Sequence, residues 1–269
     1  MDWGSRSGLG GHNRNKRKIM IKKFTYIFVF LCTTLLFSQD KEEILFVGNS
    51  FTFYWNLPSV VQKMSDERDL NWNVTQSTAG GATLKQHWMG EKNLDTKKLI
   101  EGNSYSKIIF QDHSMNPIIA IDSTKKYYYQ FKELIPSSTK TYFYSTWMYP
   151  KMDDHDRDLL KINTIEKNLA NSGINRTSVL LLVGKAFDRF RSKYPEHKLL
   201  GDDMKHQSAN GTYLAACVIF STLSNQSSKG LKYRYFGKDN NGKKIYYILT
   251  NGGVAEKCQE IADSVVFNN

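Results

Sequence analysis

The sequence predicts an α/β fold, a three-layer α/β/α sandwich around a five-stranded parallel sheet. Short runs of β-branched and aromatic residues alternate with longer segments in which apolar residues recur at helical spacing. The chain has 269 residues, of which 40% are apolar, enough to bury the core of one domain. Polar motifs follow several of the predicted strands, and loops in that position commonly bind ligands in parallel sheets.

The strands and helices are predicted from these local patterns. The strands cover residues 44–47, 72–75, 107–110, 141–144 and 178–182. The helices cover residues 58–64, 156–170, 185–194, 209–224 and 254–267, the first opening on a proline that suits a first helical turn. Because strands alternate with helices, each connection is predicted to be a crossover, which makes the sheet parallel.

The N-terminal 38 residues are predicted to lie outside the domain. Met20 and two lysines precede an apolar run over residues 24–37, and Ser38 follows it. A charged start, about fourteen apolar residues and a small residue at the exit are typical of a secretory signal peptide, whereas a membrane span needs roughly 20. We therefore predict an upstream segment at 1–19, a signal peptide at 20–38 and a single domain at 39–269. The chain is expected to be exported, periplasmic or extracellular after cleavage near Ser38.

Charge and cysteine content narrow the range of partners. The formal net charge is +11, but residues 1–38 hold seven Lys/Arg and one Asp, which leaves about +5 for the predicted mature chain. The remaining lysines are scattered rather than clustered, so a nucleic-acid partner is not expected. Cys32 lacks the small preceding residue of a lipidated cysteine, so no stable membrane anchor is expected. Cys217 and Cys258 either form a disulfide or are buried thiols.

One candidate nucleophile follows the first strand. The motif Gly48-Asn49-Ser50-Phe51-Thr52 places Ser50 at the strand end. A serine hydroxyl becomes a useful nucleophile only with a base within reach and with donors for the oxyanion that it creates. By itself the motif is more typical of a strand-to-helix turn capped by Ser or Asn, so the remainder of the chain must supply the partners.

A candidate base and its partner occur late in the chain. Residues 201–206 read Gly-Asp-Asp-Met-Lys-His, and Asp203 and His206 are three positions apart. One loop can then deliver an imidazole together with the carboxylate that fixes its tautomer. His206 is predicted to take the Ser50 proton and return it to the leaving group, and Asp203, or alternatively Asp202, to orient the imidazole.

Taken together, these motifs resemble the SGNH (GDSL-like) hydrolase superfamily. The resemblance rests on the Ser50 motif after strand one, the late Asp203-x-x-His206 and the helix that follows, with Gly211-Thr212-Tyr213-Leu214-Ala215-Ala216, and it spans most of 39–269. It implies a flavodoxin-like sandwich and ester hydrolysis through an acyl-enzyme on Ser50, Asp203 and His206. No cofactor and no metal are expected, and the His and Asp residues at 112–113 and 153–156 are interpreted as solvated loops.

The resemblance also implies an oxyanion hole with three donors. These are the N–H of the nucleophile itself, a glycine N–H after strand two and a side-chain amide after strand three. Gly81 is preferred to Gly80 for the second donor because a glycine lets the substrate approach the backbone. Residues 111–117 depart from the family's usual Gly-x-Asn-Asp, and Gln111 is predicted to supply the amide, with Asn116 as the alternative.

The expected substrate is a small-molecule or glycan ester. Export and polar strand-end loops favour a carbohydrate carrying acetyl or other short acyl groups, and aromatic side chains near strand ends could stack on a sugar ring or pack in the core. The alternatives are a lipase or lysophospholipase-type esterase and a catalytically silent carbohydrate-binding protein on the same fold. The residues predicted to line the substrate site are Asn49, Trp55, Trp147 and Asn116.

Overall fold

A computed structural model describes residues 41–149 and 164–268, together with Met1 and Gly4. Lys41–Asn269 form one compact unit. The predicted signal peptide at 20–38 and the cleavage position near Ser38 lie outside the described residues, as does nearly all of the predicted upstream segment.

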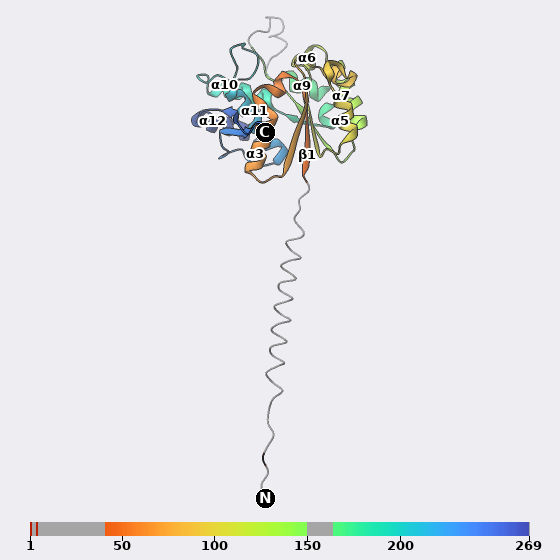
Figure 1. Ribbon diagram of the computed structural model, residues 1–269. Coiled ribbons are helices and arrows are strands. Elements are labelled where there is room, and N and C mark those ends of the chain that lie inside the picture. Colours follow the sequence, from red (N-terminus) through yellow and green to blue (C-terminus); the bar gives the residue numbers. More distant parts are fainter. Residues whose placement is uncertain (2–3, 5–40, 150–163, 269) are drawn as a thin grey trace. The chain divides into compact units, whose positions relative to one another are not determined.

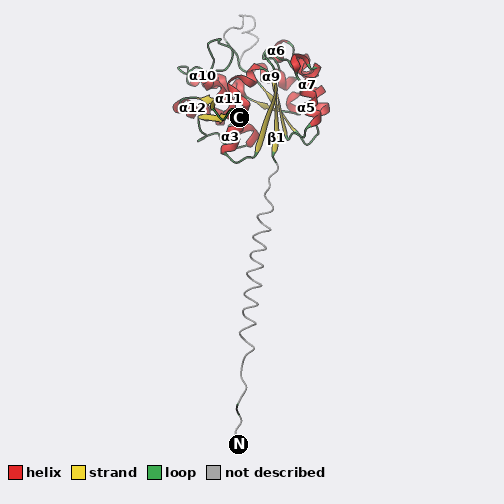
Figure 2. Ribbon diagram, viewed as in Figure 1, coloured by secondary structure: helices red, strands yellow, loops and turns green. Residues whose placement is uncertain are grey.

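The centre of this unit is a five-stranded parallel sheet with the strand order β2-β1-β3-β4-β5 (Figures 1 and 2). Each strand overlaps one of the five predicted runs, and only β5 is shorter than its prediction at 178–182, so the predicted sheet is confirmed. The strands are β1 (Glu42–Gly48), β2 (Trp72–Thr78), β3 (Lys107–Phe110), β4 (Lys140–Tyr144) and β5 (Val179–Leu181).

Helices cover both faces of the sheet, which confirms the predicted three-layer α/β/α sandwich. In Figure 1, α3, α10, α11 and α12 lie on one side of β1, and α5 and α7 lie on the other. The described helices are α2 (Ser50–Phe53), α3 (Leu57–Glu67), α4 (Leu84–Met89), α5 (Thr96–Gly102), α6 (Asn116–Ile119), α7 (Ile121–Leu134), α9 (Thr164–Asn171), α10 (Val183–Lys193), α11 (Ala209–Ser224) and α12 (Gly252–Val266).

The predicted helices differ most from the structure where the apolar pattern is weak. The prediction at 209–224 matches α11, whereas part of the prediction at 156–170 lies outside the described residues and α9 begins at Thr164. Helices α4, α5 and α7 were not predicted, because their sequences are rich in Lys, Gln and Tyr. An antiparallel hairpin of β6 (Arg234–Lys238) and β7 (Lys244–Leu249) was not predicted either.

The core is continuous through the sheet and the α11 layer. Residues 44–47 of β1 are all 0% exposed, because helices cover both faces of the strand. Cys217 on α11 and Cys258 on α12 are buried free thiols, which excludes the disulfide alternative. Burial raises the pKa of the Cys217 thiol to about 12. None of the helices in the described ranges is both long and apolar enough to cross a bilayer.

The order of the strands determines where a ligand would bind. The chain leaves β1 through α3 on one side of the sheet, and it leaves β2 through α4 and α5 on the other side. The direction of winding therefore changes between β1 and β3. In doubly wound sheets ligands bind at this position, at the carboxyl ends of the strands. Ser50 follows β1 directly at that edge.

Candidate active site

Ser50 is the first residue of α2, two residues after the end of β1. Asn49 is the N-cap of this short helix, and its side-chain oxygen accepts a hydrogen bond from the N–H of Phe51 at 3.1 Å. Gly48 is required by close packing, because a Cβ there would lie 2.3 Å from Oγ1 of Thr52. The turn therefore presents Ser50 at the carboxyl edge of the sheet.

The structure brings Ser50, Asp203 and His206 together. Nε2 of His206 lies 2.8 Å from Oγ of Ser50, and its Nδ1 lies 2.5 Å from Oδ2 of Asp203. Burial would raise the pKa of Asp203, but hydrogen bonds from the His206 ring and from the N–H groups of Lys205 and His206 outweigh it and hold the pKa at about 2. The ionised carboxylate makes Nδ1 the protonated nitrogen, so Nε2 accepts the Ser50 proton.

Hydrogen bonds within the loop and from Trp147 hold the loop that carries Asp203 and His206 in place. The other carboxylate oxygen of Asp203 accepts the N–H groups of Lys205 and His206, each at 2.9 Å. The carbonyl of Lys205 accepts a hydrogen bond from Nε1 of Trp147 at 3.1 Å. Asp202 is exposed and makes no such contact among the described residues, so Asp203 rather than Asp202 is the partner of His206.

Aromatic rings enclose the imidazole of His206. The ring of Tyr54 stacks on it with centroids 4.3 Å apart and an interplanar angle of 9°. The ring of Phe51 approaches from another direction at 5.1 Å. Stacking of this kind restricts the rotation of the imidazole and holds its Nε2 toward Ser50.

Two backbone donors are suited to an oxyanion. Among the described residues, the N–H groups of Ser50 and Gly81 have no acceptor. Gly81 has a φ of 60°, in the left-handed region that favours glycine. The carbonyl of Ala82, next to it, accepts Nδ2 of Asn49 at 2.9 Å, which ties this turn to the Ser50 loop.

Gln111 does not occupy the position expected of the third donor. Its side chain is 0% exposed, and Oε1 accepts the N–H of Asn49 and Oγ1 of Thr52, both at 3.0 Å. Its Nε2 donates to the carbonyl of Asp112. The expectation for Gln111 is therefore corrected: this residue directly follows β3 with its side chain facing the interior, and both ends of its amide are hydrogen-bonded behind the Ser50 loop.

Two residues predicted to line the substrate site are also structural. Asn49 is 1% exposed, and its amide nitrogen is bonded to the carbonyls of Ala82 and Asp112. Trp147 is 1% exposed and stacks on Phe187 with ring centroids 4.0 Å apart. Neither side chain can stack on a sugar, and both predictions are corrected: these residues support the loops that carry Ser50 and His206.

The other two predicted substrate residues remain accessible in part. Trp55 is 50% exposed, and it has a φ of 51°, rare for a bulky side chain. Asn116, at the start of α6, is half-buried and donates through Nδ2 to Oδ1 of Asp112 at 3.2 Å. Trp55 therefore leaves half of its side chain exposed, directly after Tyr54 in the sequence, whereas Asn116 already uses one of its donors.

His113 is a candidate site residue that the sequence reasoning missed. It is half-buried in the loop after β3, and its Nδ1 accepts the N–H of Met115 at 3.4 Å, which leaves the proton on Nε2. Burial lowers its pKa, and the charge of Lys205 lowers it further. The sequence did contain a signal for this residue. If the family's Gly-x-Asn-Asp is aligned so that its Gly falls on Gln111, directly after β3, its Asn falls on His113.

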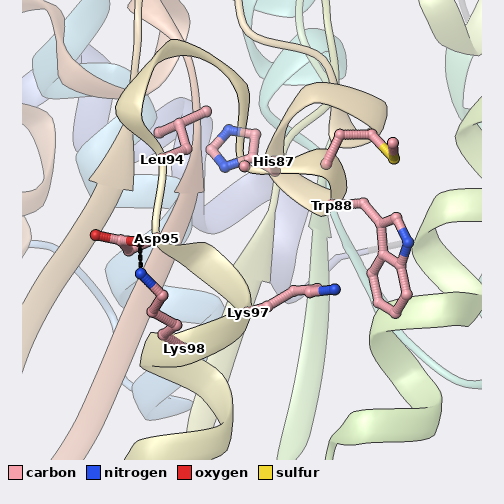
Figure 3. Close-up of a pocket in the computed structure, with 8 residues that line it drawn as sticks. His87, Trp88, Leu94, Asp95, Lys97 and Lys98 are labelled. Atoms are coloured by element: carbon pink, nitrogen blue, oxygen red, sulfur yellow. Dashed lines mark hydrogen bonds and ion pairs between the residues drawn. The ribbon is translucent and has the colours of Figure 1, made fainter.

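A buried histidine behind the site connects it to α4 and α5. Nε2 of His87 lies 3.0 Å from the carbonyl of Gly48, and Nδ1 lies 2.7 Å from Oγ1 of Thr96. A carbonyl only accepts, so His87 donates to Gly48 and accepts from Thr96. Figure 3 shows this ring at a hollow of about 240 Å³ between α4 and α5, which Lys97 and other residues line. Neither the serine nor the histidine of the candidate triad lines this hollow.

No group of three metal-ligating side chains is present in the described ranges. The acidic run at 153–156 lies outside them.

Several solved structures share the fold of this chain. No protein-family model and no curated protein matches the sequence. A DUF4886 family protein from Bacteroides uniformis matches with a TM-score of 0.61 at 17% identity, over 85% of this chain and 96% of that one. A candidate SGNH hydrolase from Slackia heliotrinireducens matches with a TM-score of 0.57 at 20% identity, over 68% and 100%.

A third structure, a lipase/acylhydrolase from Enterococcus faecalis, matches with a TM-score of 0.51 at 15% identity, over 68% of this chain and 96% of that one. The chain therefore has the SGNH hydrolase fold, as its resemblance to that superfamily implied.

Proposed function

We propose that the protein is a serine esterase that acts through an acyl-enzyme. The observation that carries this proposal is the continuous relay from Ser50 Oγ to His206 Nε2, at 2.8 Å, and from His206 Nδ1 to Asp203, at 2.5 Å. The hydrogen-bond distances and the ionised carboxylate are those that general-base activation of a serine requires.

The reaction follows from these positions. Ser50 Oγ attacks the ester carbonyl carbon as its proton moves to His206 Nε2, and Asp203 stabilises the imidazolium that forms. When the tetrahedral intermediate collapses, His206 gives that proton to the departing alcohol oxygen, and the acyl group stays on Ser50. Water then attacks the acyl-enzyme with His206 as base, which releases the acid and restores Ser50.

The oxyanion of each intermediate is proposed to lie against three donors. Two are the N–H groups of Ser50 and Gly81, which have no acceptor among the described residues. The third is Nε2–H of His113, because Gln111 is buried and bonded elsewhere. A neutral imidazole suits this role, since it donates one hydrogen bond and does not compete with His206 as the base.

The nucleophile is tested with p-nitrophenyl acetate and longer-chain p-nitrophenyl esters. Ser50→Ala should lower kcat by roughly 10⁴-fold or more, because the serine and histidine act as one unit. Ser138→Ala is the matched control, because Ser138 is exposed in the turn before β4, at the opposite edge of the sheet. Equal turnover by Ser50→Ala and wild type, with both proteins folded, contradicts the esterase assignment.

The third donor is tested separately. His113→Ala should lower kcat by about 10²- to 10³-fold with little change in KM, because the donor acts on charge that exists only in the transition state. His113→Gln restores an N–H donor and should recover part of the loss. If Asn116→Ala lowers kcat and His113→Ala does not, the third donor is Asn116.

The substrate is proposed to be a carbohydrate carrying acetyl or other short acyl groups, cleaved after export. The half-exposed side chain of Trp55 supports this choice, because it follows Tyr54, which stacks on His206, and an exposed aromatic face can stack on a sugar ring. Activity confined to short acyl chains, with release of acetate from acetylated xylan, is the expected result. Mass spectrometry of the secreted protein should locate its first residue just after Ser38.

One observation favours a lipase-type esterase as the alternative. The β6–β7 hairpin exposes Phe236, Tyr246 and Leu249 by about half, and Asn56 donates to the carbonyl of Tyr247 on this hairpin. An apolar surface next to the Tyr54–Asn56 segment could hold an acyl chain. Turnover that rises with acyl length up to a long-chain optimum would favour this alternative over deacetylation.

A further inference from the structure

A lysine lies directly over the turn that carries the Gly81 N–H. Nζ of Lys92 donates to the carbonyl of Gly80 at 2.6 Å, and it would lie 3.8 Å from a Cβ added to Gly81. The backbone of Lys92 is left-handed with a φ of 55°, as is that of Asn93 with a φ of 59°. Such conformations are uncommon for these side chains and are costly. The chain therefore accepts strain where it places this ammonium group beside a proposed oxyanion donor.

A second lysine lies on the other side of the site, next to the catalytic histidine in sequence. Nζ of Lys205 is 5.4 Å from the ring centroid of Tyr149 and 6.0 Å from that of Phe51. The Phe51 ring is 5.1 Å from the ring of His206, whose Nε2 contacts Ser50. Lys205 is half-buried, and a hydrogen bond from Trp147 holds its backbone carbonyl, while the two ring faces lie beside its ammonium group.

The two ammonium groups act on the same space. The pKa of His113 is lowered by burial, then by Lys205, while Asp112 raises it and Lys92 lowers it again. His113 therefore lies within the electrostatic range of both lysines. Lys92 lies over Gly81, and Lys205 lies over the Phe51 ring that packs on His206, so positive charge approaches the proposed ester position from two elements of the site.

Neither ammonium group has a carboxylate partner in the described ranges. Neither Lys92 nor Lys205 forms an ion pair there. Asp112 is 2% exposed, and its two oxygens accept hydrogen bonds from four donors. Asp203 is occupied by His206 and by two backbone N–H groups. Among the described residues, therefore, no carboxylate competes with a ligand for either ammonium group.

We propose that Lys92 and Lys205, here termed the cationic rim, select esters that carry an anionic group, a carboxylate or a phosphate, close to the scissile bond. This inference rests on the proposed esterase function and narrows its substrate class to an acidic alcohol component such as an acylated acidic sugar. Lysine suits the role because its ammonium is a compact charge on a flexible side chain, so it can pair with an anion in more than one orientation.

The test compares matched acetate esters that differ in charge. The probes are 4-acetoxybenzoate and 4-acetoxyphenyl phosphate, which are anionic at neutral pH, and methyl 4-acetoxybenzoate, which is not. For each variant the measured quantity is the ratio of kcat/KM on an anionic ester to kcat/KM on the neutral ester. A loss of activity that affects all esters equally does not change this ratio. The carboxylate and phosphate probes distinguish the two kinds of anion.

The ratio should fall about threefold in Lys92→Gln and in Lys205→Gln, and about tenfold in the double variant, the size expected of partly exposed ion pairs. Lys140→Gln is the matched control, because it removes the same charge from an exposed side chain at the amino end of β4. Raising the salt from 0.1 to 1 M should lower the wild-type ratio, since the screening length falls from about 10 Å to about 3 Å.

The outcomes separate this inference from the proposed function. If Ser50→Ala abolishes turnover and the double variant keeps the wild-type ratio for both anionic probes, the cationic rim does not select substrates and the inference is overturned. A wild-type ratio that does not respond to salt overturns it as well. If turnover of all three esters is independent of Ser50, the esterase function fails first, and the inference fails with it.

Discussion

The buried histidine behind the serine loop should make the stability of the protein depend on pH. His87 is 0% exposed, and burial lowers its pKa from 6.5 to about 4, although the hydrogen bond to the carbonyl of Gly48 opposes this. Between these two pH values the unfolded chain binds a proton at this position and the folded protein does not. Stability from this group is therefore complete above about pH 6.5 and is lost as the pH falls toward 4.

The magnitude follows from the two pKa values. At about 1.4 kcal/mol for each pH unit, the difference corresponds to about 3 kcal/mol of unfolding free energy lost between neutral pH and pH 4. Glutamine is the matched replacement for His87, because its amide can donate to Gly48 and accept from Thr96 without titrating.

The assay is urea unfolding of wild type and His87→Gln at pH 7 and at pH 4.5. Carboxylates titrate alike in both proteins, so the difference between the two free energies isolates His87. The advantage of wild type over the variant should shrink by about 2 to 3 kcal/mol on acidification. An advantage that stays constant to within about 1 kcal/mol would refute the reasoning, because His87 would then not be held neutral by burial.

Three further predictions concern the supports of the site. Asp203→Asn should lower kcat on p-nitrophenyl acetate by about 10³- to 10⁴-fold with an unchanged urea midpoint, because an amide can hold His206 in the wrong tautomer; normal turnover would contradict this. Gly48→Ala should destabilise the fold by about 1 to 3 kcal/mol in urea unfolding, because its Cβ would lie 2.3 Å from Oγ1 of Thr52; wild-type stability would show that the turn can relax. Trp147→Phe keeps an aromatic ring but loses the donor to the Lys205 carbonyl, so kcat should fall about fivefold; a change in stability alone would argue against loop positioning.

The central strands of the sheet could be predicted because they are buried on both faces. Residues 44–47 and 108–110 are continuous apolar runs bounded by polar residues or glycine, and that pattern needs no tertiary information. Helix α7 was missed because much of its surface is polar, with tyrosines and lysines that do not give a clear apolar stripe. The β6–β7 hairpin was missed because its strands expose most of their side chains, so burial left little periodicity in the sequence.

The candidate site was predictable where one short loop carries the chemistry. Asp203 and His206 are three residues apart, so local spacing was sufficient to place their side chains together. The third donor was not predictable in this way, because the direction of each side chain after β3 depends on the path of the loop. Gln111 turns inward to the N–H of Asn49, whereas His113, two residues later, is only half-buried. The burial of the tryptophans could not be predicted from the sequence either, since Trp147 is in the core and Trp55 is half-exposed.

The parallel stacking of Tyr54 on His206 gives the site its own spectroscopic marker. The imidazole lies face to face with the tyrosine ring at a centroid distance of 4.3 Å, and a circulating π-electron current shields nuclei held above a ring. The carbon-bound protons of His206 should therefore resonate upfield of those of an ordinary histidine in proton NMR spectra. This displacement reports the order of the loop in the resting protein, without any substrate or turnover.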